Sequence, residues 1–337
     1  MNILENISLK PFNTFGIDKK ARFFTIVKSL SELKEALYWA NTQNIKVILL
    51  GGGSNILLTQ DQDALIIKLE LKGINLIQTD DLHFYVEVGA GENWHGFVQN
   101  AIENNWSGVE NLSLIPGTVG ASPMQNIGAY GVEIKDVFSH LVALNRSTFE
   151  LEEFNSEACG FGYRESVFKN VLKDKYVICS VVFRLNKYPE FHTNYGAIQQ
   201  TLATNGVKEL SIKAIADAVV QIRQSKLPDP KQIGNAGSFF KNPTVPIQVF
   251  EALRKNYPDI PGYSTDNGIK IPAAWLIEQC GWKGKRFGEI GVHSQHPLVL
   301  VNFGNGDGKE IQKLAQNIQE SVKQKFGVEI IPEVNFL

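Results

Sequence analysis

Two glycine-rich segments are the places where this backbone is best suited to approach a ligand closely. Residues 113–131 contain four glycines, two prolines and almost no charge, and Gly51, Gly52 and Gly53 stand between two apolar segments. Glycine has no Cβ and tolerates positive φ, so neutral loops of this kind suit the wall around a large, flat or anionic cofactor. Taken alone, the glycine triplet also fits a tight β-turn without a ligand.

The glycine triplet lacks the marks of two common nucleotide-binding loops. Residues 54–59 are typical of a strand, whereas the Rossmann fingerprint opens a helix. No glycine-lysine-serine or glycine-lysine-threonine sequence occurs, which argues against nucleotide hydrolysis. A strand–loop–strand arrangement can still bind a pyrophosphate through successive backbone N–H groups.

Three cations have side chains suited to anion binding. Arg164 stands among glycines and aromatic residues, where its planar fork suits a carboxylate or a phosphate. An ordinary surface salt bridge is the alternative. Arg223 and Lys226 are i,i+3 neighbours at the end of a predicted helix, and they suit a diphosphate or complement the helix dipole.

Residues 234–243 contain a serine and an asparagine around an aromatic pair. If this segment is a strand, Ser238, Phe240 and Asn242 share one face. Ser238 lacks the G-x-S-x-G elbow of hydrolases, so nucleophilic catalysis is not expected. Its hydroxyl can instead serve as a proton donor, which needs no triad.

Acids and histidines offer two further candidates. Glu333 lies in a short apolar segment near the end of the chain, and such an acid faces either solvent or a site. His293 and His296 are three residues apart, without an H-E-x-x-H motif or a nearby acid pair. We therefore expect no metal site there.

The elements that position these residues begin with a βαβ unit. Residues 21–27 and 46–50 are typical of strands. Between them, Ser29 and Glu32 have the spacing of a capping box. This box opens a helix with one apolar face, formed by Leu33, Ala36, Leu37 and Ala40.

The spacing of apolar residues and the positions of capping and breaking residues predict the remaining elements. Strands are expected at 83–88, within 137–185 (the clearest at 176–185), at 237–241, at 298–302 and at the C-terminal 330–337. Helices are expected at 94–104, 211–226, 247–256, 272–280 and 309–325, and Leu227-Pro-Asp-Pro230 ends the second of these. Residues 188–206 are polar and weakly patterned, which indicates a boundary or a mobile loop.

Composition narrows the class of protein. A chain of 337 residues is long enough for two or three domains, and a net charge of -2 favours neither nucleic acid nor an anionic membrane. No run of about 18 apolar residues and no signal peptide are present. The three cysteines, Cys159, Cys179 and Cys280, are widely separated, which fits buried thiols in a reducing compartment. A cytoplasmic protein is expected.

Several segments resemble a flavoenzyme family of bacterial peptidoglycan precursor synthesis, the UDP-N-acetylenolpyruvoylglucosamine reductases (UDP-N-acetylmuramate dehydrogenases). They run in order over nearly the whole chain, at residues 13–17, 50–55, 115–121, 125–131, 162–164, 227–230, 234–243 and 332–333. The most specific combination is G-A-Y-G at 128–131, G-N-A-G-S-F-F-K-N-P at 234–243 and the terminal Pro332-Glu333.

The resemblance implies an α+β protein with a vanillyl-alcohol-oxidase-type FAD-binding fold. Two α+β subdomains would hold FAD, and a third α+β domain would bind the substrate. The expected boundaries are 1–70 together with the strand 328–337, then 71–208, and 209–327 for the substrate-binding domain.

The resemblance also implies tightly bound, non-covalent FAD with NADPH as hydride donor. The residues expected to line FAD are Gly51, Gly52, Gly53, Ser54, Asn55, Pro116, Gly117, Thr118, Gly120 and Ala121. Residues 192–196 resemble the loop of the longer of the family's two types, whose tyrosine folds over the substrate. Tyr195 would be that tyrosine, unless it is a plain exposed loop residue.

The implied reaction has two halves. NADPH would reduce the flavin, which would then pass a hydride to the vinyl carbon of UDP-N-acetylglucosamine enolpyruvate and give UDP-N-acetylmuramate. Arg164 and a protonated Glu333 match the residues that stabilise the developing charge, and Ser238 matches the proton donor. Substrate contacts are expected from Tyr195, Arg223, Lys226, Asn242 and Gln295. A monomer is expected, with no nucleic-acid or membrane partner and a role in cell-wall synthesis, cell shape and cell division.

Two other functions remain open at this point. Another FAD oxidase or dehydrogenase would keep the flavin but would not need a diphosphate cradle such as Arg223, Lys226 and the 234–243 segment. A non-catalytic nucleotide-sugar binding protein would contain no flavin. The resemblance argues against both because it extends over nearly the whole chain.

Overall fold

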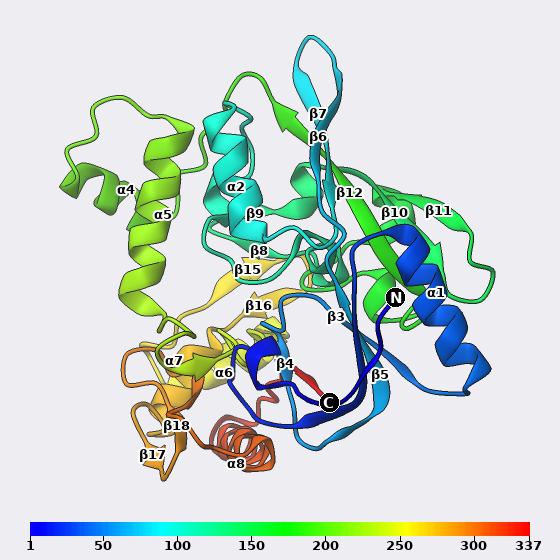
Figure 1. The fold of residues 1–337 in the computed structure, drawn as a ribbon. Coiled ribbons are helices and arrows are strands. Elements are labelled where there is room, and N and C mark those ends of the chain that lie inside the picture. Colours follow the sequence, from blue (N-terminus) through cyan, green and yellow to red (C-terminus); the bar gives the residue numbers. More distant parts are fainter. The chain divides into compact units, whose positions relative to one another are not determined.

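The chain forms two compact units, whose helices and strands are labelled in Figure 1. The computed structural model describes residues 1–195 and 197–337 in full, and Gly196 only as the first residue of a helix. The first unit comprises Met1–Ile7, Ala21–Gly52 and Asp63–Ser225. The second comprises Ser8–Lys20, Gly53–Gln62 and Lys226–Leu337. The predicted three-domain boundaries stay a prediction.

The first unit begins with a four-stranded sheet covered by one helix. The strand order is β1 (Leu4–Ser8), β2 (Lys20–Val27), β5 (Gln62–Leu69) and β3 (Val47–Leu50), and β3 is parallel to β5. Helix α1 (Leu30–Thr42) buries the four predicted apolar residues against this sheet. Ser29 caps it by accepting the N–H of Glu32, while Glu32 accepts from Lys28 and not from Ser29. The predicted βαβ order is thus confirmed.

A second, antiparallel sheet forms the centre of this unit. Its order is β11 (Leu151–Asn155), β10 (Phe138–Asn145), β12 (Tyr176–Asn186), β7 (His83–Gly89) and β6 (Ile74–Thr79). Helix α2 (Trp94–Glu103) buries an aromatic face on it, and the ring of Phe97 stacks on Phe183 of β12 at 4.7 Å. The strands predicted at 83–88 and 176–185 and the helix at 94–104 are confirmed.

Short elements connect this sheet to the loops of interest. They are 3-10 helices η2 (Glu110–Leu112), η3 (Val119–Ala121), η4 (Pro123–Gln125), η5 (Ile134–Asp136) and η6 (Val167–Lys169), helix α3 (Ser156–Cys159), and the hairpin β8 (Gly128–Ala129) with β9 (Val132–Glu133). The residues that follow Pro116 are therefore held in successive tight turns.

Helices α4 (Gly196–Thr204) and α5 (Ile212–Lys226) lie side by side (Figure 1). The prediction of a helix at 211–226 is confirmed. The prediction of a boundary or loop at 188–206 is wrong for its second half. Ile198 and Leu202 of α4 are buried against Ile215 and Val219 of α5. Two apolar residues one turn apart gave too weak a pattern, and packing against α5 decides the structure.

The second unit contains small sheets and three helices. One sheet has the order β13 (Gly234–Asn235), β19 (Leu300–Asn302), β18 (Ile290–Val292) and β17 (Arg286–Phe287). A second has β14 (Thr244–Val245), β16 (Gly268–Lys270) and β15 (Tyr263–Thr265). Strand β20 (Asn335–Phe336) runs parallel to β4 (Ile56–Leu57), so a strand does follow the glycine triplet. The remaining elements are η1 (Lys10–Phe12), α6 (Ile247–Asn256), α7 (Ala273–Gln279) and α8 (Gly308–Phe326). All three predicted helices are confirmed.

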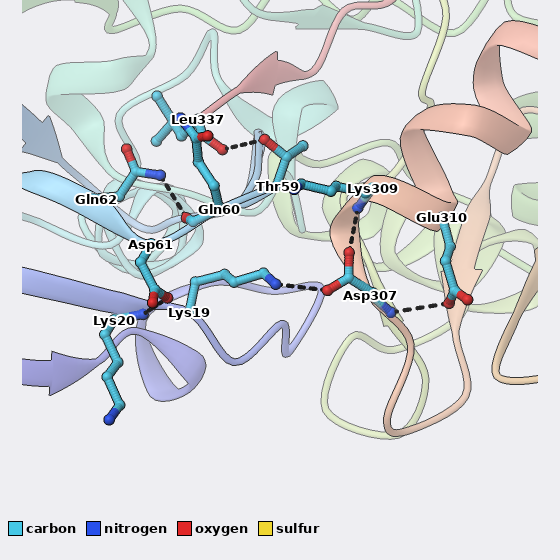
Figure 2. A network of polar contacts seen from close by, with 10 residues as sticks. All are labelled: Lys19, Lys20, Thr59, Gln60, Asp61, Gln62, Asp307, Lys309, Glu310 and Leu337. Carbon is cyan, nitrogen blue, oxygen red and sulfur yellow. Dashed lines mark hydrogen bonds and ion pairs between the residues drawn. The ribbon is translucent and has the colours of Figure 1, made fainter.

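Polar contacts fix the C-terminus and the start of α8 within the second unit (Figure 2). The carbonyl of Leu337 accepts from the backbone N–H and the hydroxyl of Thr59 at 2.6 and 2.8 Å. Asp307 caps α8 in a capping box with Glu310, and Lys19 donates to its carboxylate at 2.6 Å. In the part of the chain that the structure describes, no helix is both long enough and apolar enough to cross a membrane.

Candidate active site

Two glycine loops of the first unit meet backbone to backbone. A Cβ on Gly51 would stand 2.6 Å from Oγ1 of Thr118, and a Cβ on Gly52 would stand 2.8 Å from Cα of Gly117. Any side chain at these positions would separate the loops, so the sequence requirement for glycine is steric. Gly52 is nevertheless exposed on its other side. A backbone-lined cradle of this kind fits a flat, anionic cofactor such as FAD.

The second glycine loop is fixed by the connection between β7 and α2. Gly117 has φ +120° and accepts from the N–H of Trp94 at 3.1 Å. Gly120 donates to Ala90 at 2.9 Å, and a Cβ on it would stand 2.5 Å from Cβ of Ala90. Of the residues predicted to line FAD, Pro116 and Ala121 are exposed and Thr118 is buried. These bonds leave the loop little freedom, as a pre-formed cofactor wall requires.

The start of this loop is held by two side chains that sequence reasoning missed or interpreted differently. Leu114 has φ +58°, in the left-handed region that disfavours a branched residue. Its N–H donates to Nδ1 of His95 at 3.0 Å, and its carbonyl accepts from Nε of Arg223 at 3.2 Å. His95 was not among the predicted site residues, because no motif in the sequence marks it. Arg223 was predicted to contact the substrate, and its backbone contact was not foreseen.

Burial and a neighbouring charge favour the neutral form of the His95 imidazole. Burial lowers the pKa of His95, and the nearby Arg223 cation lowers it further. Burial also lowers the pKa of Arg223, whereas the phenol of Tyr130 opposes that shift. Only a neutral imidazole accepts at Nδ1, so the bond to Leu114 and the lowered pKa of His95 agree.

Arg164 is held by backbone carbonyls of the same unit. Its Nη2 donates to Gly128 at 2.6 Å and its Nη1 donates to Asn126 at 3.4 Å, and the guanidinium lies 5.5 Å from the ring centre of Tyr163. Arg164 itself has φ +56°. A strained backbone position with a half-buried cation is typical of a functional residue.

Tyr195 and Tyr130 form an aromatic pair in the first unit. Their ring centres lie 5.7 Å apart at an angle of 77°. Tyr195 is 56 % exposed and precedes α4 as its N-cap residue. Tyr130 contacts Arg223 and has φ +51°. The signal for Tyr130 was its place in the glycine-rich 125–131 motif, although it was not chosen as a site residue.

In the second unit, Ser238 and Glu333 belong to segments that pair. The N–H of Glu333 donates to the carbonyl of Phe239 at 2.8 Å, and that of Lys241 donates to Ile331 at 2.9 Å. A single antiparallel bridge joins Phe240 to Pro332. This pairing puts the proposed proton donor one residue from the backbone partner of the proposed acid.

The prediction of a strand at 237–241 is wrong. Only the isolated bridge at Phe240 has strand pairing, and Phe239 and Phe240 are both buried, which strict alternation forbids. Gly237 has φ +69° and turns the chain before Ser238. The predicted common face of Ser238, Phe240 and Asn242 therefore does not follow from a regular strand.

Gly53, Ser54 and Asn55 belong to the second unit. Gly53 has φ +64°, and a Cβ on it would overlap the carbonyl oxygen of Phe12. Its own carbonyl accepts from the N–H of Thr14 at 3.1 Å. The side chain of Asn55 donates to the carbonyl of Glu333 at 3.3 Å. The predicted cofactor residue Asn55 thus fixes the backbone of the predicted acid.

The other predicted substrate residues of the second unit lie on different elements. Oδ1 of Asn242 accepts from the N–H of Ala273 at 2.9 Å and so caps α7. Lys226 and Gln295 are exposed. Lys226 is close enough to His296 to affect its titration, since burial, then His293, then Lys226 lower the pKa of His296. Asn242 therefore has a structural contact in addition to its proposed role.

The cysteines have the raised pKa values of buried thiols, which are poor nucleophiles. Burial raises the pKa of Cys159 to about 12 and that of Cys179 to about 11, and all three cysteines are free. Within residues 1–195 and 197–337, no cluster of three or more His, Cys, Asp or Glu side chains has the arrangement of a metal site.

Comparisons with known proteins agree with this geometry. A family model described as an FAD-binding domain matches residues 21–146. A model described as the C-terminal domain of UDP-N-acetylenolpyruvoylglucosamine reductase matches residues 229–337. The chain is 53 % identical to the reductase of that name from Amoebophilus asiaticus over the full length of both, and 49 % identical to the one from Pseudomonas putida over 98 % of both.

Solved structures share the fold. The reductase of Thermus caldophilus superposes with a TM-score of 0.68 at 22 % identity and covers 99 % of this chain and 98 % of its own. A 6-hydroxy-D-nicotine oxidase from Arthrobacter nicotinovorans superposes with a TM-score of 0.51 at 10 % identity, over 97 % of this chain and 86 % of its own.

The fold and the glycine cradle define the class: an FAD-dependent oxidoreductase with the α+β fold of the vanillyl-alcohol-oxidase type. Sequence identity of about 50 % to its curated relatives, over the full length of both chains, then identifies the particular family. The chain belongs to the UDP-N-acetylenolpyruvoylglucosamine reductases, as its motifs had predicted.

Proposed function

We propose that this enzyme uses NADPH and FAD to reduce UDP-N-acetylglucosamine enolpyruvate to UDP-N-acetylmuramate, in peptidoglycan precursor synthesis. Family membership over the whole chain supports the reaction class. The observation that carries the assignment of residues is the hydrogen bond from Glu333 to Phe239, which joins the segments of the proposed acid and the proposed proton donor Ser238.

Bound FAD would supply hydride chemistry, taking a hydride from NADPH and passing one to the terminal vinyl carbon of the substrate. The residues proposed to line it are those of the two glycine loops, where the Gly52–Gly117 contact already forms a backbone cradle. We propose tight, non-covalent binding. Precipitation of the protein with acid should then release the flavin into solution, whereas a covalent flavin would stay in the pellet.

The side chains of the chain itself would control charge and protons. Addition of a hydride to the vinyl carbon drives an electron pair toward the substrate carboxylate. Arg164 would bind that carboxylate, and a protonated Glu333 would donate a hydrogen bond to the developing charge. Ser238 would then give its hydroxyl proton to the α-carbon and regain one from solvent. The net change is addition of one hydride and one proton across the double bond.

Substrate contacts are proposed for five side chains. Arg223 and Lys226 would face the diphosphate, with Asn242 and Gln295 nearby. Tyr195 would close over the bound nucleotide as in the longer type of the family, and its ring is 56 % exposed. We also propose a cytoplasmic monomer, with a role in cell shape and division through the cell wall.

The test is a visible spectrum recorded without oxygen. NADPH is added first and the enolpyruvyl sugar nucleotide second. The flavin absorption should bleach after the first addition and return after the second. A flavin that bleaches but stays reduced would refute the proposed substrate. Faster bleaching by NADH than by NADPH would refute NADPH as the hydride donor.

A further inference from the structure

Lys68 carries a positive charge directly behind the glycine loop. It lies on β5, opposite Leu50 of β3, and its Nζ donates to the carbonyl of Gly51 at 2.6 Å. In the described part of the chain, this ammonium makes no ion pair with a carboxylate. All of these residues belong to the first unit.

The partial burial of the Lys68 ammonium costs free energy of folding. Its side chain is half-buried, and burial lowers the pKa of Lys68, an effect that Glu70 partly offsets and Lys72 reinforces. A half-buried cation whose one hydrogen bond goes to a backbone carbonyl gains less than one paired with a carboxylate. An apolar side chain, such as those of Ile66 and Ile67 on the same strand, would carry no such cost of charge burial.

The bond to Gly51 orients a peptide group toward the exposed side of the loop. The carbonyl of Gly51 and the N–H of Gly52 belong to one planar trans peptide and point in opposite directions. Lys68 holds the carbonyl end, so the N–H of Gly52 points away from Lys68. Within the described residues that N–H has no acceptor, and Gly52 is exposed.

We propose that Lys68 is a positioning residue for the FAD diphosphate, which it favours through the Gly51–Gly52 peptide and through its own charge. An ammonium at the carbonyl end polarises the peptide and strengthens its N–H as a donor to an anion. This inference rests on FAD being the cofactor and extends it to a residue outside the glycine motifs.

The experiment measures FAD affinity directly. Flavin is removed from the whole protein, and FAD is titrated back while flavin fluorescence is followed, at low and at high salt. Lys68→Met should raise Kd by about tenfold or more. The salt dependence of binding should become shallower, since one cation has been removed. Lys68→Gln retains a donor without the charge and should lie between Lys68→Met and the parent protein.

Lys46→Met is the matched control. Lys46 is exposed just before β3, at the opposite end of that strand from Gly51, so the variant loses the same charge in the same sheet. Its FAD affinity should equal that of the parent. Thermal unfolding of the flavin-free forms shows whether each variant is folded. If Lys68→Met unfolds, Lys68→Gln and Lys68→Arg supply the comparison.

The FAD titrations of these variants distinguish a role of Lys68 in FAD binding from a purely structural role. Weaker FAD binding by folded Lys68→Met, with a shallower salt dependence, supports the proposal. Unchanged FAD affinity would refute the proposal. An unchanged salt slope together with lower stability of the flavin-free form would also refute it, because both results would mean that Lys68 has a structural role only. Failure of the parent protein to bind FAD would instead refute the cofactor and would not bear on Lys68 alone.

Discussion

Leu114 donates its backbone N–H to Nδ1 of His95 at 3.0 Å, and this bond holds a left-handed leucine at the entrance of the second glycine loop. On its other side, the carbonyl of Leu114 accepts from Arg223, which is proposed to bind the substrate diphosphate. A single strained residue therefore connects the loop proposed to line the cofactor to a predicted substrate residue within one unit.

Replacement of His95 should destabilise the protein in a pH-dependent manner. His95→Ala removes the acceptor for Leu114 and should cost about 1–2 kcal/mol at neutral pH. His95→Asn presents an oxygen near the Nδ1 position and should cost less. Urea unfolding followed by circular dichroism measures both. Equal costs for the two variants would contradict a role for the acceptor.

The pH dependence follows from the lowered pKa of His95. The folded state binds fewer protons than the unfolded state, in which histidine titrates at about pH 6.5. Stability should therefore be greatest above that pH and should fall as the pH drops toward the lower folded-state pKa. His293 and His296 also have lowered pKa values, so the difference between parent and His95→Asn isolates His95. That difference should change with pH only in this window.

Gly52→Ala should weaken FAD binding, because its Cβ would stand 2.8 Å from Cα of Gly117 and would push the loops apart. We expect Kd for FAD to rise by about tenfold or more. Gly96→Ala is the matched control: it lies inside α2, and its Cβ would make ordinary contacts, the nearest at 3.6 Å. That control should bind FAD normally and gain about 0.5–1 kcal/mol of stability. Equal affinities in the two variants would refute the cradle.

Ser238→Ala should separate the two half-reactions. Flavin reduction by NADPH should keep the parent rate, whereas reoxidation by the enolpyruvyl substrate should slow by about a hundredfold or more. Stopped-flow absorbance without oxygen measures both. Ser321→Ala provides the control, since Ser321 lies in α8 and bonds only within its own helix. Unimpaired reoxidation in Ser238→Ala would remove this serine from the mechanism.

Glu333 should act as a hydrogen-bond donor and not as a negative charge. Glu333→Gln keeps a neutral donor, and Glu333→Ala removes it. We expect reoxidation to slow by about a hundredfold or more in the alanine variant and much less in the glutamine variant. The bond from Glu333 to Phe239 involves backbone atoms only, so neither substitution removes its donor. An alanine variant as fast as the glutamine variant would contradict the donor role.

Asp307→Ala should destabilise the second unit. The side chain caps α8 and accepts from Lys19, so its loss should cost about 1–2 kcal/mol in denaturant unfolding. Burial acts to raise the pKa of Asp307, but the bonds from Lys19 and Lys309 outweigh it and the pKa lies below the ordinary value. This stability is present above about pH 3.9, where an unfolded aspartate titrates, and should disappear as the pH falls through the folded-state pKa. The exposed Asp259→Asn serves as control and should leave stability unchanged.

Local sequence was sufficient wherever a single element determines its own structure. The helix at 247–256 matches the observed one residue for residue, α5 begins one residue after its predicted start, and α1 begins directly after the predicted cap Ser29. Periodic apolar residues and capping side chains act over one or two turns, so they can be recognised without knowledge of the rest of the chain. The glycine loops were also recognisable, because only glycine combines missing bulk with positive φ.

Tertiary structure decided what depends on distant partners. Phe239 and Phe240 are both buried, and their segment forms an isolated bridge to Pro332 and a bond to Leu298 in place of a regular strand. Helix α4 forms because Ile198 and Leu202 pack against buried residues of α5. Gly52, Arg223 and Glu333 could be predicted from the sequence. Their contacts with Gly117, Leu114 and Phe239, respectively, are known only from the tertiary structure. Contacts between residues far apart in the chain leave no periodic trace, and side-chain packing alone selects them.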